Sequence, residues 1–184
     1  MKTKYYFSDD VFMHEPVLYN KKILCAFHTS GIERKYGYFY IIDENNQLVL
    51  YYTLTTGEEI IQFIKDYDNS IGIPKGTSFR DIFEIPDFKE KYTNNFLQKR
   101  KLDNQEYIRN TINKMEKDNI YDAKNEIQGL DGFSIELKLN KEDKSFYSWC
   151  YSDDKKYFYI LDFVNSILDE LNINERYRFK KVEN

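Results

Sequence analysis

The chain has 184 residues, of which 41% are hydrophobic and 17% aromatic, and its formal net charge at pH 7 is −4. That much apolar material can build a buried core, so the composition excludes wholesale disorder even though 32% of the residues are charged. The negative balance argues against a general nucleic-acid-binding protein, because a polyanion has to be met by a basic field.

The first half of the chain predicts three antiparallel strands followed by a helix. Short runs rich in aromatic and β-branched residues predict strands at 22–28, 36–42 and 48–54, and the last two flank a polar turn that indicates a hairpin with a loop of about four or five residues. Thr56 and Glu59 have the spacing of a capping box, so a helix should run over 57–68. Further on, Ser78 is expected to cap a short helical turn over 79–82.

A polar helical pair is predicted in the middle of the chain. Residues 87–118 contain no Gly or Pro and carry thin apolar stripes at helical spacing, which predicts helices at 88–101 and 104–118. We place the break near Asp103, which can cap the second helix because Glu106 follows three residues later. The segment holds eight basic and six acidic residues, so our interpretation is a slightly positive, solvated helical pair on one edge of the protein.

The C-terminal part repeats the order of hairpin, polar turn and helix. Strict alternation predicts a half-buried strand over 133–139, paired with a strand over 144–151, and a helix over 156–171 follows. We therefore predict an α+β fold, with one or more antiparallel sheets built from two hairpin-then-helix units and the polar helical pair between them. The predicted core consists of apolar residues on the inner faces of these elements: Ile23, Phe39, Ile41, Leu50, Ile60, Ile64, Phe133, Ile135, Leu137, Ile160, Leu161, Val164 and Leu168.

Length and cysteine usage predict a single cytoplasmic domain. If residues 1–184 form two lobes instead, we expect them at 1–86 and 119–184, joined by a helical connector at 87–118. The two cysteines are far apart and do not resemble the framework of a secreted protein. No apolar run reaches the roughly 18 residues of a membrane span, so we expect no membrane partner. The richness in Lys, Asn, Ile and Tyr fits an AT-rich bacterial or phage genome.

No motif in the sequence points to catalysis, a cofactor or a metal, and we predict none of the three. Cys25 and His28 have a C-x-x-H spacing, but residues three apart in a strand lie on opposite faces, and a zinc site normally needs four ligands. The stretch 72–78 lacks the lysine that follows the second glycine of a phosphate-binding loop. An enzyme or small-molecule-binding protein, with a site assembled only in the tertiary structure, is the alternative. It would draw on His14, Cys25 or Cys150, His28, Lys75 and Arg80.

The strongest functional signal is the stretch 146–163, which holds eight aromatic residues around a charged turn. Aromatic side chains anchor protein interfaces, and acidic charge speeds association with a basic partner. We therefore predict a non-enzymatic protein that binds another protein with a basic surface and inhibits or sequesters it, as toxin-immunity proteins and phage inhibitors of host defence do. The expected contact residues are Tyr147, Trp149, Tyr151, Asp153, Asp154 and Tyr159, the last of them exposed at the start of the C-terminal helix.

Two other interpretations of the C-terminal part stay open. Trp149 can belong to the core, with Asp153 and Asp154 serving only as helix caps. Alternatively, the chain is a structural subunit that forms a homodimer through an edge strand, for which the alternating residues 176–182 are the best candidate.

Overall fold

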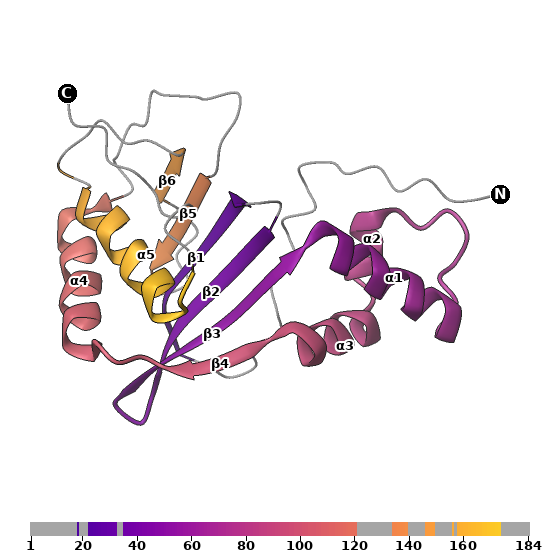
Figure 1. Ribbon diagram of the computed structural model, residues 1–184, viewed down its shortest axis with the longest axis horizontal. Helices are drawn as coiled ribbons and strands as arrows, with labels where there is room; N and C mark the ends of the chain where they lie inside the picture. Colours follow the sequence, from indigo (N-terminus) through magenta and orange to yellow (C-terminus); the bar gives the residue numbers. More distant parts are fainter. Residues whose placement is uncertain are drawn as a thin grey trace.

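The structure is a computed structural model that describes residues 18, 22–32, 35–120, 134–139, 146–149, 156 and 158–173. A six-stranded antiparallel sheet organises this part of the chain. The strands are β1 (Ile23–Ile32), β2 (Lys35–Glu44), β3 (Gln47–Thr56), β4 (Gln98–Lys101), β5 (Ser134–Leu139) and β6 (Phe146–Trp149). Their order in the sheet is β4-β3-β2-β1-β5-β6 (Figure 1). The predicted α+β class is confirmed, and both predicted hairpins belong to one sheet because β5 pairs with β1.

The helices occupy two places relative to this sheet. They are α1 (Gly57–Ile71), α2 (Phe79–Phe83), α3 (Pro86–Phe96), α4 (Gln105–Asp118) and α5 (Phe158–Glu170). Helices α4 and α5 lie side by side over one face of the sheet, whereas α1, α2 and α3 gather beyond the ends of β3 and β4 (Figure 1). Helices α1, α2 and α3, residues 57–96, are called the helical unit below.

The hairpin between β2 and β3 is tighter than predicted. Glu44 pairs with Gln47, so the loop consists of Asn45 and Asn46 alone. Both asparagines have positive φ angles, 54° and 68°, which a type I′ turn requires and which Asn tolerates better than most residues. The backbone N–H of Asn46 donates to Asp43 Oδ1 at 2.9 Å. Because such a turn matches the twist of the flanking strands, the two strands extend to ten residues each.

The predicted helix over 88–101 is wrong in its last part. Helix α3 ends at Phe96, and residues 98–101 form β4, an edge strand that pairs with β3. These four residues, Gln-Lys-Arg-Lys, favour a helix by intrinsic propensity but offer no apolar side chain that a helix could bury. The edge of β3 provides backbone hydrogen-bond partners at this point, and that tertiary contribution outweighs the weak local preference.

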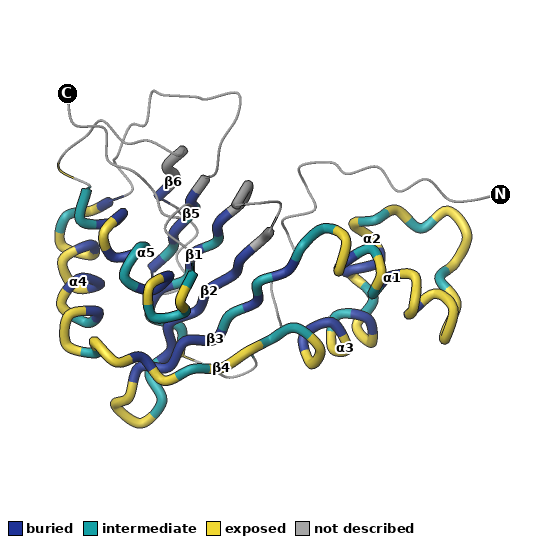
Figure 2. The backbone as a smooth tube through the Cα atoms, in the orientation of Figure 1, coloured by how far each residue is buried: buried dark blue, intermediate teal, exposed yellow. Residues whose placement is uncertain are grey.

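The main core lies between the sheet and helices α4 and α5, as the buried strands in Figure 2 show. Of the predicted core residues, Ile23 is only half-buried and Phe133 lies outside the described ranges. The others are buried: Phe39, Ile41, Leu50, Ile60, Ile64, Ile135, Leu137, Ile160, Leu161, Val164 and Leu168. Two of them, Ile60 and Ile64, belong to a separate core inside the helical unit.

The core of the helical unit is rich in aromatic rings. Phe88 is fully buried, and its ring meets those of Phe63, Tyr67 and Phe83 edge to face, with centroids 5.4, 4.9 and 4.8 Å away. Such T-shaped contacts stabilise a pair of rings beyond the area that they bury. The helical unit therefore has a core of its own, distinct from the one beneath α4 and α5.

Candidate binding surfaces

The structure describes only part of the contact surface that the sequence predicts. Tyr147 and Trp149 lie in β6, whose backbone pairs with β5, and their side chains are outside the described part of the chain. Tyr151, Asp153 and Asp154 fall outside the described ranges altogether. The contact roles of these five residues stay predictions.

The side chain of Tyr159 lies against α4 instead of standing exposed. It is half-buried and packs against the main core. Its hydroxyl donates to Asp118 Oδ2 at 2.9 Å, and Lys114 Nζ lies 4.0 Å from the centroid of its ring. The expectation of an exposed Tyr159 is therefore wrong, because helical periodicity along α5 gives no information on where α4 will pack. Tyr159 joins the two helices that cover the sheet.

Cys25 and His28 lie on opposite faces of β1, as the strand geometry predicts. Cys25 is fully buried in the main core, and burial raises the pKa of its thiol far above the ordinary value. A thiol that stays protonated is a poor nucleophile. His28 is on the other face, where its Nδ1 lies 3.6 Å from Glu136 Oε2. Cys25 and His28 therefore cannot act together as nucleophile and base; His14 and Cys150 lie outside the described ranges.

The other residues considered for chemistry are spread over exposed positions. Lys75 and Arg80 are exposed, one in the turn that precedes α2 and the other in α2 itself. Within the described ranges, no group of three or more His, Cys, Asp and Glu side chains is placed to hold a metal ion. None of the helices described there is both long and apolar enough to cross a membrane.

The outer surface of the helical unit is acidic. Residues 57–96 contain eight acidic and five basic residues, and all eight carboxylates are exposed: Glu58, Glu59, Asp66, Asp68, Asp81, Glu84, Asp87 and Glu90. Some of them hold the local structure together. Glu59 completes the predicted capping box, since its Oε2 accepts from the N–H of Thr56 at 2.6 Å while Thr56 Oγ1 accepts from the N–H of Glu59 at 3.1 Å. Asp81 forms a second capping box with Ser78, as expected for the cap of α2.

Three of these carboxylates have no side-chain partner. Glu58, Glu84 and Glu90 make no side-chain hydrogen bond or ion pair with any residue in the described ranges. By contrast, Asp87 accepts from the hydroxyl of Tyr67 at 2.9 Å and pairs with Lys91 at 3.1 Å. These two partners, Tyr67 first, hold the pKa of Asp87 below its usual value. The fold explains Asp87, and Glu58 lies in the first turn of α1, where the helix dipole favours a negative charge, but the fold does not explain Glu84 or Glu90.

An exposed apolar residue ends the first helix of the same unit. Ile71 is 51% exposed, and Tyr107 in α4, 44% exposed, is the other large apolar side chain that stands out from the described surface. Asp68 precedes Ile71 by three residues, so the two lie next to each other on the surface of α1. Single exposed apolar residues are common on protein surfaces, but one beside acidic residues has the composition of an interface anchor.

The segment that follows the helical unit is slightly basic. Residues 97–120 hold six basic and four acidic residues. In β4, Lys99 Nζ pairs with Glu44 Oε2 at 2.7 Å and lies 5.2 Å from the ring centroid of Tyr51. Arg100 and Lys101 form no ion pair with any residue that the structure describes. The segment 97–120 is therefore slightly basic, whereas the helical unit that precedes it is acidic.

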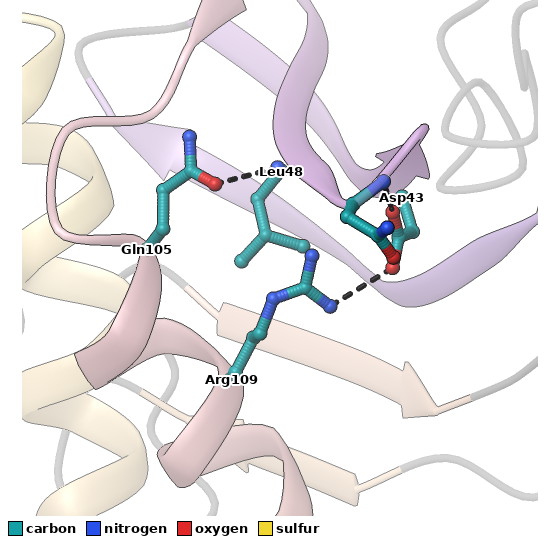
Figure 3. A network of polar contacts seen from close by, with 5 residues as sticks. Asp43, Leu48, Gln105 and Arg109 are labelled. Atoms are coloured by element: carbon teal, nitrogen blue, oxygen red, sulfur yellow. Dashed lines mark hydrogen bonds and ion pairs between the residues drawn. The ribbon is translucent and has the colours of Figure 1, made fainter.

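A polar network anchors α4 to the β2–β3 hairpin (Figure 3). Arg109 Nη1 donates to Asp43 Oδ2 at 2.9 Å. One turn earlier, Gln105 Oε1 accepts from the N–H of Leu48 at 3.0 Å, and Gln105 Nε2 donates to the carbonyl of Leu102 at 3.1 Å. The carboxamide of Gln105 thus takes the place of a peptide group at the end of the β3–β4 ladder. These contacts hold α4 against the hairpin, and within them Arg109 Nη2 is buried without a hydrogen-bond partner among the described residues.

The N-terminus of α4 is capped from a distance. The sequence predicts Asp103 as the cap, but the helix begins after Asn104 and neither side chain makes a capping bond. Instead, Glu170 at the end of α5 accepts from the N–H of Asp103 at 3.0 Å and from that of Asn104 at 3.3 Å. The carboxylate of Glu170, 66 positions from Asn104, thus binds the backbone N–H groups that lead into the helix, whereas a capping side chain at Asp103 would have accepted from N–H groups of the first turn.

The ion pair between Asp43 and Arg109 should make stability depend on pH. The hydrogen bond from Arg109 is the main reason why the pKa of Asp43 lies below its usual value. A depressed pKa in the folded state stabilises the protein above the unfolded-state pKa of about 3.9, and this contribution is lost as the pH falls below that value. Asp43→Asn should therefore cost about 1 kcal/mol at neutral pH, the difference between a charge-assisted and a neutral hydrogen bond.

The measurement is urea unfolding of both proteins at neutral pH and near pH 3. The difference in the free energy of unfolding between wild type and Asp43→Asn should be smaller near pH 3, because wild-type Asp43 then approaches protonation as well. Asp103→Asn is the matched control, since Asp103 is exposed and has no ion pair among the residues that the structure describes. If this difference in the free energy of unfolding stays constant with pH, Asp43 has its ordinary pKa.

The chain matches no protein-family model, no curated protein and no solved structure, so its function has to be inferred from its own residues.

Proposed function

We propose that this protein is a non-enzymatic protein-binding module, which engages the basic surface of another protein and thereby inhibits or sequesters it. The observation that carries the proposal is the acidic outer surface of the helical unit, with eight exposed carboxylates and the exposed Ile71 on one short segment. Acidic clusters speed the encounter with a basic protein, and apolar anchors inside a charged rim provide most of the binding energy.

The residues on this surface do not contribute to the main core. Because the helical unit has its own aromatic core, its outer residues are not needed to hold α4 and α5 on the sheet. Glu84 and Glu90 are the best candidates for partner contacts, since they are exposed and their side chains form no hydrogen bond or ion pair in the described structure. The contact residues predicted from the sequence, Tyr147, Trp149, Tyr151, Asp153 and Asp154, belong to the same proposal as a second acidic and aromatic surface.

The exposed residues Ile71 and Tyr107 provide a matched pair for testing the proposal. A photo-crosslinking amino acid is introduced at Ile71 in one variant and at Tyr107 in another, because both side chains are large, apolar and about half exposed. In cells that make the protein naturally, the probe at Ile71 should crosslink to one protein with a basic surface, and the probe at Tyr107 should not. Equal labelling from both positions, or none from Ile71, would contradict the assigned surface.

Charge variants then test how the captured partner binds. Glu84→Gln together with Glu90→Gln should slow association several-fold at low salt and leave dissociation nearly unchanged, because charges on an interface rim act mainly on the encounter. Asp103→Asn together with Glu106→Gln removes the same charge at the start of α4, outside the helical unit, and serves as the control. If both pairs slow association equally, net charge alone matters and the helical unit is not the interface.

A further inference from the structure

The outer edge of β4 is a candidate site for a second partner. We infer that it accepts an extended, acidic segment of another protein as an additional strand of the sheet. This inference concerns a different surface from the helical unit and does not depend on the proposed function.

The register of the sheet decides which backbone groups of β4 are open. The N–H of Leu102 donates to the carbonyl of Leu48 at 3.2 Å, and β4 pairs with β3 without a register shift. In an antiparallel ladder the direction of the peptide groups alternates along the strand. Gln98 and Arg100 therefore point their N–H and C=O groups toward β3, whereas Lys99 and Lys101 point theirs away from it.

No strand in the described part of the chain pairs with this outer edge, because β4 is the terminal strand of the sheet. The N–H and C=O groups of Lys99 and Lys101 form a short template for an incoming strand, which would bind by β-augmentation. Gln105 and the β3–β4 ladder hold β4 in its extended conformation, so the template exists before a partner arrives.

The side chains of β4 determine the chemistry of the partner. Lys99 is already paired with Glu44, but Arg100 and Lys101 make no ion pair with the residues described. An incoming strand places its side chains directly beside theirs, where opposite charges stabilise and like charges destabilise a cross-strand pair. A second copy of this chain that paired edge to edge through β4 would bring these cations together. The geometry thus favours an acidic segment over self-association through β4.

The test uses isotope-labelled full-length protein and a short peptide that alternates glutamate with valine. Titration should shift the amide signals of Lys99 and Lys101, and the same peptide with lysine in place of glutamate should not. Two N-methylated forms of the acidic peptide separate strand addition from simple charge attraction: one is methylated at the odd positions and the other at the even positions. One form should bind at least about tenfold more weakly than the parent and the other should bind nearly as well, because only one edge of the peptide faces β4.

Two variants of Lys101 test the same point on the protein. Lys101→Gln removes the charge alone, whereas Lys101→Pro removes the charge and the outward N–H but leaves the β3–β4 ladder intact. Lys101→Pro should weaken peptide binding more than Lys101→Gln, with both variants keeping the wild-type thermal midpoint. Absence of peptide binding, equal binding of both N-methylated forms, or equal affinities of the two variants would each overturn the inference. None of these outcomes would affect the crosslinking result at Ile71.

Discussion

Replacing Phe39 by alanine should lower the free energy of unfolding by about 3 to 5 kcal/mol. Phe39 is fully buried in β2. Its ring stacks on Phe27 of β1, with centroids 4.6 Å apart and planes 13° apart, and on Tyr52 of β3, at 6.3 Å and 8°. The substitution thus removes the middle ring from a stack that crosses three strands, and the rigid strands around it cannot close the cavity.

Urea unfolding measures this loss, and the denaturant dependence should stay unchanged if only the native state is affected. Phe79→Ala is the control, because Phe79 is only half-buried at the start of α2, and the same deletion there leaves a site that solvent can fill. A loss at Phe39 that is no larger than the loss at Phe79 would mean that the ring stack does not hold the sheet together.

Gly37 makes room for the Phe39 ring and should be energetically coupled to it. A Cβ atom at Gly37 would lie 2.5 Å from Phe39 Cε2 and 3.0 Å from Thr29 Oγ1. Gly37→Ala should therefore destabilise the protein, by about 1 to 3 kcal/mol as overpacked cores do. In the Phe39→Ala background the cost should fall, because the closest clash is gone. Additive costs in this double-mutant cycle would show that the ring moves aside freely.

Replacing Leu161 by alanine should cost about 2 to 5 kcal/mol. Leu161 lies on the face of α5 that packs on the sheet, and it is 1% exposed. The lost transfer free energy and the cavity add together at such a site, because α5 is held on the sheet by its neighbours and cannot relax inward.

Leu171→Ala is the matched control for Leu161. Leu171 follows the end of α5 and is only half-buried, so the same deletion should cost clearly less. Both variants are compared with wild type by urea unfolding. A loss of less than about 1 kcal/mol at Leu161 would contradict its place in the core.

The elements that the sequence predicts well are those whose signals are local. The Thr56–Glu59 capping box forms as expected because its residues are three apart and meet as soon as the helix begins. The alternation over 133–139 correctly indicates the strand at 134–139, and the helical spacing in 156–171 identifies four of the six buried residues of α5 but misses Phe163 and Ile167. In both segments the apolar pattern and the tertiary burial favour the same structure.

The candidate binding surfaces were harder to predict. Helical periodicity suggested an exposed Tyr159, but the side chain lies against Asp118 and Lys114 of α4. The surplus of acidic residues in 57–96 is visible in the sequence. Part of it is explained by the capping residues Glu59 and Asp81, so the surplus alone does not indicate a binding surface. Only the structure separates carboxylates that cap a helix from those, such as Glu84, that have no structural partner among the described residues.

By itself, the sequence determined the α+β class, the hairpin-then-helix order and eleven of the buried core residues, because backbone periodicity and short-range capping are properties of neighbouring positions. The tertiary structure decided that both hairpins share one sheet, that 98–101 form a strand, and that Glu170 caps α4. Each of these outcomes depends on a competition for backbone hydrogen bonds between segments far apart in the chain. A local pattern has no information about the distant segment, so only the assembled fold resolves the competition.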